Sequence, residues 1–267
     1  NEKWFEPASK VINFMKLRAT WGKVGNAKIT GRRFAYLATI QNKGSYTFGQ
    51  NGDQSFSGLE IGEEAVDVSW ETAYKWNLGL DINTLSNALS LHADVFYDMR
   101  EGIFLARGDL PWYVGMTNMP LGNLGKVKNK GFEVSAEYKK QFNDEWFLSL
   151  MANCSFNRNE VVDNDVKYAY PWLDVRGQRV GQRYGYIAEK LFESDEEVAA
   201  SAYQSGDTRA GDIKYKDLNG DGKIDQYDKA PIGWGSVPEI MYGFGFSLAY
   251  KGWSLSAMFQ GAGHVDV

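Results

Sequence analysis

The sequence predicts an all-β fold, namely a segment of a large antiparallel transmembrane β-barrel with long extracellular loops. Apolar and polar side chains alternate with a period of two over runs of up to about thirteen residues, whereas strands of soluble proteins average about 5–6 residues. Short and long connections between these runs also alternate along the chain. Aromatic residues make up 15% of the 267 residues, and 29 glycines accompany only 6 prolines, which favours strands joined by open loops.

The longest alternating run covers residues 70–82 and has one largely apolar and one largely polar face. The apolar face carries Trp70, Thr72, Tyr74, Trp76, Leu78, Leu80 and Ile82. The polar face carries Glu71, Ala73, Lys75, Asn77, Gly79 and Asp81. A second run follows at 89–98 after about six residues, and two alternating runs joined this closely predict a β-hairpin.

Two further hairpins follow the same pattern, and seven strands are predicted in total. One hairpin joins 132–139 to 146–157, and the other joins 242–250 to 253–259 across the Lys251-Gly252 turn, while a single strand at 15–21 precedes them all. An odd number does not match the usual closed single-chain barrel, in which every strand edge is paired. We therefore expect one part of a wider barrel, and the start at Asn1, without a signal peptide, is expected to lie inside a longer protein.

The connections differ in length in a way that predicts an orientation. Those within each hairpin have about three to six residues, whereas those between hairpins are long and polar, at 23–69, 99–130 and 158–238. Loops of this length are uncommon in compact soluble domains, but transmembrane barrels combine short periplasmic turns with long extracellular loops. A large soluble β-sandwich with aromatic core residues remains the structural alternative.

Composition excludes several functions. The net charge of −5 and the pI of about 5.2 argue against nucleic acid as a partner, since binding phosphates requires a basic surface. Cys154 is the single cysteine, so neither an intrachain disulfide nor a cysteine metal cluster can form, and two histidines argue against a histidine-rich metal site. No apolar run approaches the roughly 18 residues of a membrane helix, but barrel strands carry their hydrophobicity in alternate residues.

An acidic stretch from Asp217 to Asp228 matches the spacing of an EF-hand Ca²⁺ loop, with oxygen ligands at positions 1, 3, 5, 7, 9 and 12 and glycine at position 6. The predicted ligands are Asp217, Asn219, Asp221, the backbone carbonyl of Lys223, Asp225 and Asp228. Position 12 is aspartate rather than the usual glutamate, and no clear helices flank the loop. The expected role is to brace the longest loop, and the alternative is a turn-rich acidic segment without a metal.

The sequence gives little indication of catalysis. His92 and Asp94 share one face of a predicted strand, which indicates a polar lumen surface rather than a catalytic dyad. Aromatic residues in the polar loops are better candidates for contact with a substrate or a partner protein, because exposed rings stack on sugars and pack against proteins. These residues are Trp112, Tyr113, Tyr168, Tyr170, Trp172 and Trp234, and ordinary packing within the loops is the alternative.

Three motifs resemble those of SusC/RagA-type TonB-dependent transporters of Bacteroidetes. Residues 21–26 (WGKVGN) resemble their W-G-x-x-G-N signature, and residues 123–133 (NLGKVKNKGFE) resemble their N-x-G-x-x-x-N-K-G-F-E segment. Residues 211–225 (GDIKYKDLNGDGKID) resemble a stretch in a late extracellular loop of the same family. The motifs occur in the family's order and extend over most of the chain.

The resemblance implies that residues 1–267 form part of the C-terminal β-barrel of a TonB-dependent receptor of about 22 strands with a plugged lumen. It implies an outer-membrane importer, not an enzyme, for glycans or peptides, with a SusD-like surface lipoprotein, lipid and TonB as partners. The plug and the TonB box, N-terminal in the family, are expected to lie outside this sequence. The lumen face is expected to carry Lys16, Arg18, Glu71, Lys75, Asp94, Glu133 and Glu137. A secreted Ca²⁺-dependent carbohydrate-binding β-sandwich is the alternative function.

Overall fold

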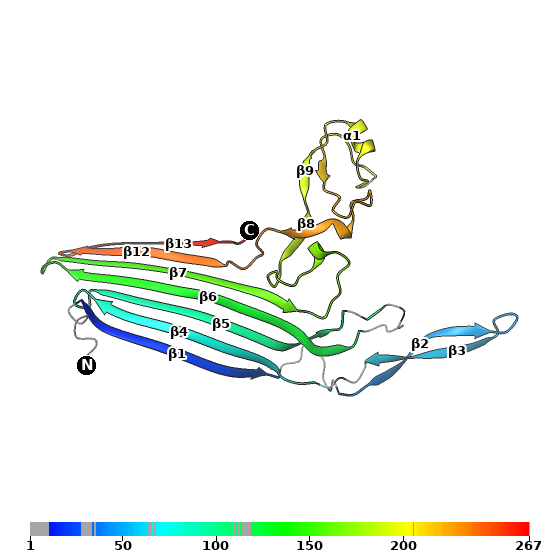
Figure 1. Ribbon diagram of the computed structural model, residues 1–267, viewed down its shortest axis with the longest axis horizontal. Coiled ribbons are helices and arrows are strands. Elements are labelled where there is room, and N and C mark those ends of the chain that lie inside the picture. Colours follow the sequence, from blue (N-terminus) through cyan, green and yellow to red (C-terminus); the bar gives the residue numbers. More distant parts are fainter. Residues whose placement is uncertain are drawn as a thin grey trace.

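A single curved sheet of seven antiparallel strands dominates the computed structural model (Figure 1). The structure describes residues 11–27, 34, 36–63, 66, 68–108, 110–111, 113, 119–204 and 206–266. In spatial order the strands are β1 (Ile12–Asn26), β4 (Glu71–Thr84), β5 (Leu89–Ala106), β6 (Leu121–Gln141), β7 (Trp146–Asp163), β12 (Ile240–Tyr250) and β13 (Trp253–Gly263). All seven predicted strands and all three predicted hairpins are confirmed.

Several strands extend beyond the ends expected from the sequence, so the long connections are shorter than predicted. Strands β5 and β6 together take up most of the expected 99–130 loop, and the connection between them is only 107–120. The other two long connections cover 27–70 and 164–239. Alternation of apolar residues fails in the extensions because polar pairs such as Lys128 and Glu160, with Nζ and Oε1 at 2.7 Å, replace the apolar face there.

The two faces of the sheet differ in chemistry along its whole width. One row in register contains Leu17, Leu80, Ala93, Val134, Cys154 and Tyr242. Many apolar side chains on this face are exposed, for example Leu17 at 66% and Trp253 at 83%. Among the described residues, no second sheet packs against this face. The β-sandwich alternative needs such a second layer, whereas an exposed apolar face is what a barrel presents to lipid.

The opposite face is polar and is crossed by ion pairs. Arg18 on β1 donates from Nε to Asp81 on β4 at 2.9 Å and from Nη2 to Asp94 on β5 at 2.9 Å. Gly79 lies beneath this bridge, where a Cβ atom would be 2.6 Å from Cζ of Arg18. The register places Arg18, Lys75, Asp94 and Glu133 on this one face, as predicted, but His92 bonds Asp81 at 3.0 Å rather than its sequence neighbour Asp94.

The long connections contain secondary structure of their own at one end of the sheet (Figure 1). Connection 27–70 forms a hairpin of β2 (Thr39–Phe48) and β3 (Gln54–Glu63). Connection 164–239 contains two small sheets, in which β8 (Arg183–Tyr186) pairs with β11 (Lys229–Ile232), and β9 (Ala188–Leu191) pairs with β10 (Ile213–Tyr215). It also contains helix α1 (Asp195–Ala200) and the 3₁₀ turns η4 (Pro171–Leu173) and η5 (Gln226–Asp228).

Within the described part of the chain, none of the helices has the length and apolar character required to cross a membrane.

Candidate ligand-binding surface in the long loop

The connection between β7 and β12, which we call the long loop (164–239), is fastened to the end of β7. The amide of Val161 donates to the carbonyl of Gln178 at 2.8 Å, and the amide of Gly177 donates to the carbonyl of Val161 at 2.8 Å. The amide of Val180 donates to Oδ1 of Asn159 at 2.7 Å. These bonds extend the backbone pairing of the sheet into the loop, so the loop has a fixed starting direction.

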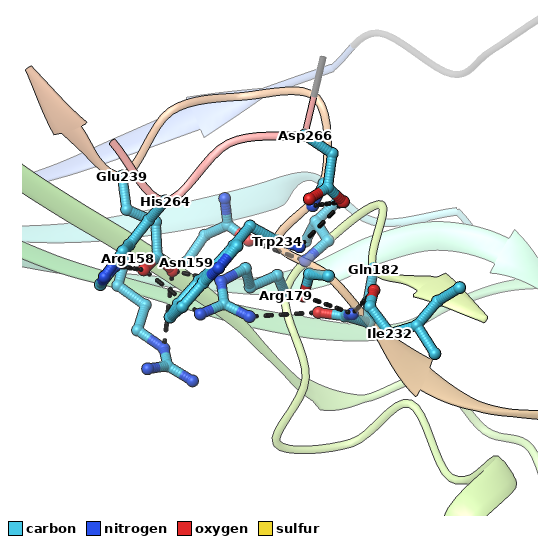
Figure 2. Close-up of polar contacts among 12 residues, drawn as sticks. Arg158, Asn159, Arg179, Gln182, Ile232, Trp234, Glu239, His264 and Asp266 are labelled. Atoms are coloured by element: carbon cyan, nitrogen blue, oxygen red, sulfur yellow. Dashed lines mark hydrogen bonds and ion pairs between the residues drawn. The ribbon is translucent and has the colours of Figure 1, made fainter. Parts of the chain in front are cut away.

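A buried ion pair holds the same region from the other side (Figure 2). Arg179 donates two hydrogen bonds to the carboxylate of Glu239, and the two side chains are only 11% and 5% exposed. Nδ1 of His264 lies 3.1 Å from Oε2 of Glu239, and Nε of Arg158 lies 3.7 Å from Oε1. Burial alone would raise the pKa of Glu239, but the hydrogen bonds from Arg179 and His264 outweigh it and leave this pKa below its usual range.

Trp234 belongs to this buried cluster. Its ring stacks on that of His264 with centroids 3.7 Å apart, and the guanidinium of Arg179 lies 4.5 Å from the Trp234 ring centre. The amides of Trp234 and Gly235 both donate to Asp266, and these two bonds lower the pKa of that carboxylate. Trp234 thus packs between the loop and the sheet while 38% of its surface stays exposed.

A second aromatic group lies further along the long loop. The rings of Tyr170 and Trp172 are stacked, with centroids 4.7 Å apart and an angle of 9°, and Tyr227 packs edge-on against Tyr170. Nε1 of Trp172 donates to the carbonyl of Tyr227 at 2.7 Å. The structure thus brings together two of the predicted contact residues and adds Tyr227, which the sequence did not single out.

An open pocket of about 400 Å³ lies next to these rings. Its lining is mostly apolar and consists of Tyr168, Leu173, Val175, Tyr184, Gln226, Tyr227 and Lys229. The hydroxyl of Tyr184 donates to the carbonyl of Asp174 at 3.1 Å, and burial raises its pKa. A mostly apolar hollow with a few fixed polar groups has the general character of a small-ligand site.

The two remaining predicted contact residues lie in connection 107–120. Tyr113 is 73% exposed, whereas Trp112 lies outside the described residues. Tyr113 is not among the residues that line the pocket of the long loop.

The acidic loop from Asp217 to Asp228 is held by its own backbone amides. Asp217 accepts from the amides of Gly220 and Gly222, at 2.7 and 2.9 Å, and Asp221 accepts from the amide of Lys223 at 2.8 Å. Asp228 is fully buried and accepts from the amides of Leu218, Asn219 and Asp225. Asp228 closes the loop by linking its two ends, and Asp225 caps the short turn η5 by accepting from the amide of Tyr227.

The donor set suits a hard cation, since carboxylate, amide and carbonyl oxygens are the ligands that Ca²⁺ prefers. Among the described residues, however, no three His, Cys, Asp or Glu side chains gather around one point. A carboxylate oxygen can accept a backbone hydrogen bond and still bind a cation through its second lone pair. The residues therefore fit a Ca²⁺ ion in kind, and binding requires their side chains to turn toward one centre.

The cluster around Arg179 and Glu239 was not expected from the sequence. The two residues are separated by about sixty positions, and neither belongs to a recognisable motif. The available signal was indirect, because Glu239 lies three residues before the predicted strand 242–250 and Arg179 lies in the predicted loop 158–238. Only the return of the chain after the long loop brings the two charges together.

These observations define a class of protein: a β-barrel wall with one apolar and one polar face, and with large structured loops at one end. The chain belongs to the TonB dependent receptor-like, beta-barrel family, whose model matches residues 8–266. The proteins of this family reside in the outer membrane and are transporters rather than enzymes, which confirms the predicted fold, family and localisation.

Among its relatives, TonB-dependent receptor P3 of Formosa agariphila is 29% identical over 266 residues, covering 94% of this chain and 26% of its own length. TonB-dependent receptor SusC of Bacteroides thetaiotaomicron is 24% identical over 259 residues, which cover 92% of this chain and 24% of the length of SusC. The chain therefore spans about a quarter of the length of these relatives.

Solved structures of a related assembly share the fold. The RagAB peptide transporter matches with a TM-score of 0.63 at 20% identity, over 94% of this chain and 26% of the other. The RagAB peptide importer in its open-open state matches with a TM-score of 0.66 at 20% identity, over 96% of this chain and 26% of the other.

Proposed function

We propose that this chain forms part of the wall and the long loops of a SusC-like transporter that imports nutrients across the outer membrane with energy from TonB. The proposal rests on one observation: the seven-stranded sheet has an exposed apolar face on one side and a polar face with ion pairs on the other. Such a sheet suits a wall with lipid outside and a polar lumen inside. The family match and the loops at one end of the sheet support the same assignment.

The proposed substrates are oligosaccharides or peptides. Support comes from the relatives, one of which is SusC and another a peptide transporter, and from the aromatic pocket of the long loop. Tyrosine rings stack on sugar faces and pack equally well against peptide side chains. Binding of both ligand classes to the full-length protein is the direct test.

The matched variants for this test are Tyr168→Ala, which removes a wall of the pocket, and Tyr203→Ala, which removes an exposed ring elsewhere in the long loop. We expect Tyr168→Ala to weaken the binding of one ligand class about tenfold, as loss of an aromatic contact does, while Tyr203→Ala leaves it unchanged. Equal binding by both variants and the wild type would remove the pocket from the proposal.

We also propose that a SusD-like surface lipoprotein covers the loop end of the barrel. The structured long loop and the exposed β2–β3 hairpin provide large surfaces there, and the related RagAB structures support an assembly of this kind. Affinity purification of the tagged full-length protein in mild detergent should recover such a lipoprotein in a defined ratio. Recovery of the barrel alone, from cells that express both proteins, would contradict this assembly.

A further inference from the structure

A groove crosses strands β1, β4 and β5 on the apolar face. Its volume is about 420 Å³. Two rows of side chains in register border it: the rings of Trp21, Trp76 and Tyr97, and below them Ala19, Leu78 and Val95. The groove is present because Ala19 ends at its Cβ atom between the longer side chains of Leu17 and Trp21.

Basic residues continue the row of aromatic rings on the same face. The register runs from Tyr97 on β5 to Lys130 on β6 and then to Arg158 on β7. Lys23 lies two residues beyond Trp21 on β1, with its Nζ atom 5.3 Å from the centre of the Tyr74 ring. Lys23 therefore lies beyond the groove toward the loop end, and Lys130 and Arg158 lie beside it on the next two strands.

Lys130 and Arg158 are directly opposite each other on neighbouring strands, and two like charges in this position destabilise a sheet. Lys130 is exposed and forms no ion pair with any residue that the structure describes. Arg158 is 3.7 Å from a single carboxylate, that of Glu239, which Arg179 already occupies with two hydrogen bonds. The neighbouring Lys128, in contrast, has its own partner in Glu160.

We propose that this face binds a phosphate-bearing membrane lipid, with its phosphate between Lys130 and Arg158 and an acyl chain along the groove. Membership of the family places the apolar face against lipid, and rows of Trp and Tyr mark the level of the headgroups. Basic side chains at that level bind anionic lipid headgroups. The proposal depends on the membrane position of the wall and not on which nutrient the protein imports.

The chain supplies a matched control for the charge. Lys140 lies on the same strand and the same face as Lys130, ten residues further on, but opposite Leu148 rather than a basic residue. At about 3.3 Å per residue, the two lysines are roughly 33 Å apart along β6, near opposite ends of a membrane wall. Ala19→Leu is a second, uncharged probe, because it fills the groove without altering the basic pair.

The test is native mass spectrometry of the full-length protein in mild detergent, with dipalmitoyl phosphatidic acid or dipalmitoyl phosphatidylcholine added to the micelles. We expect wild type to retain phosphatidic acid in preference to phosphatidylcholine. Lys130→Gln should lower this retention about fivefold, in line with one basic contact to an anionic surface, and Lys140→Gln should leave it unchanged. Ala19→Leu should also lower retention, while inorganic phosphate should not displace the lipid.

Equal losses in Lys130→Gln and Lys140→Gln, or equal retention of the two lipids by wild type, would overturn the proposal. Complete displacement by inorganic phosphate would show a site for free anions instead. Heat-modifiable migration on a gel checks that each variant is a folded barrel. If Lys130→Gln does not fold, Ala19→Leu decides the matter, and unchanged retention in that variant contradicts the lipid site.

Discussion

The guanidinium of Arg18 on β1 passes over Gly79 on β4 and reaches Asp94 on β5, so one side chain links three strands of the wall. A Cβ atom at Gly79 would be 2.5 Å from Oδ1 of Asp94 and 2.6 Å from Cζ of Arg18, both closer than van der Waals contact. The absence of a side chain at residue 79 is therefore a condition of the bridge.

Gly79→Val should break this bridge. We expect a loss of about 1–3 kcal/mol in the free energy of unfolding, as for other forced overpacking, together with the lost ion pairs. Gly22→Val is the matched control, since it lies in β1 and a Cβ there meets nothing within 4 Å. Denaturant unfolding of the full-length protein in detergent measures both variants. Equal stability of Gly79→Val and Gly22→Val would show that the space above Gly79 is not required.

Docking of the long loop should depend on pH through Glu239. The pKa of this carboxylate is lowered in the folded protein. Its contribution to the stability of the docked loop is therefore complete above the ordinary glutamate pKa of about 4.3 and is lost as pH falls through the lower pKa of the folded protein. We expect hydrogen exchange at 177–182 to accelerate, after correction for the intrinsic rate, only when pH falls below about 4.3.

Two variants separate this effect from general acid unfolding. Glu239→Gln should accelerate exchange at 177–182 already at neutral pH and remove the dependence, because Arg179 then lacks its buried counter-charge. Glu189→Gln, an exposed position in the same loop, should behave as wild type. Retention of the wild-type pH profile by Glu239→Gln would assign the effect to another group.

The acidic loop gives a prediction that separates metal binding from backbone capping. Calorimetry should show that the full-length protein binds Ca²⁺ and that Asp221→Ala loses this binding, because a predicted ligand at loop position 5 is removed. Equal Ca²⁺ binding by the two proteins would reject the site.

Asp228→Ala is expected to disorder the loop even without Ca²⁺. Its buried carboxylate satisfies the amides of Leu218, Asn219 and Asp225, and leaving such donors unpaired costs about 1–3 kcal/mol each. Limited proteolysis between residues 217 and 228, in the presence of a chelator, measures this. Cleavage no faster than in wild type would show that Asp228 does not hold the loop.

The strands of the wall could be predicted from the sequence, whereas the structure of the loops could not, for a physical reason. The period of two in runs such as 70–82 arises because successive side chains alternate between an apolar and a polar face, so both faces of the wall follow from it. The outer part of β6 was missed because Lys126, Lys128 and Lys130 interrupt the apolar pattern while the backbone ladder continues.

The parts of the loops that were not predicted depend on contacts distant in sequence. Two examples are the ion pair of Arg179 with Glu239 and the packing of Tyr227 on Tyr170. Each forms only because the folded long loop brings together residues that are almost sixty positions apart or more. The β2–β3 hairpin was missed although a local signal was present, since Gly49 and Gly52 stand between two runs containing Tyr46, Phe48 and Phe56.

The most direct test of the account is the orientation of the wall in the membrane. A single cysteine is placed in the full-length protein, with Cys154 replaced by serine, either at Tyr203 in the long loop or at Lys251 in a short turn. Intact cells are treated with a membrane-impermeant maleimide. We expect labelling of the Tyr203→Cys variant on intact cells and of the Lys251→Cys variant only after the outer membrane is permeabilised. Labelling of Lys251→Cys on intact cells, with Tyr203→Cys protected, would contradict this orientation.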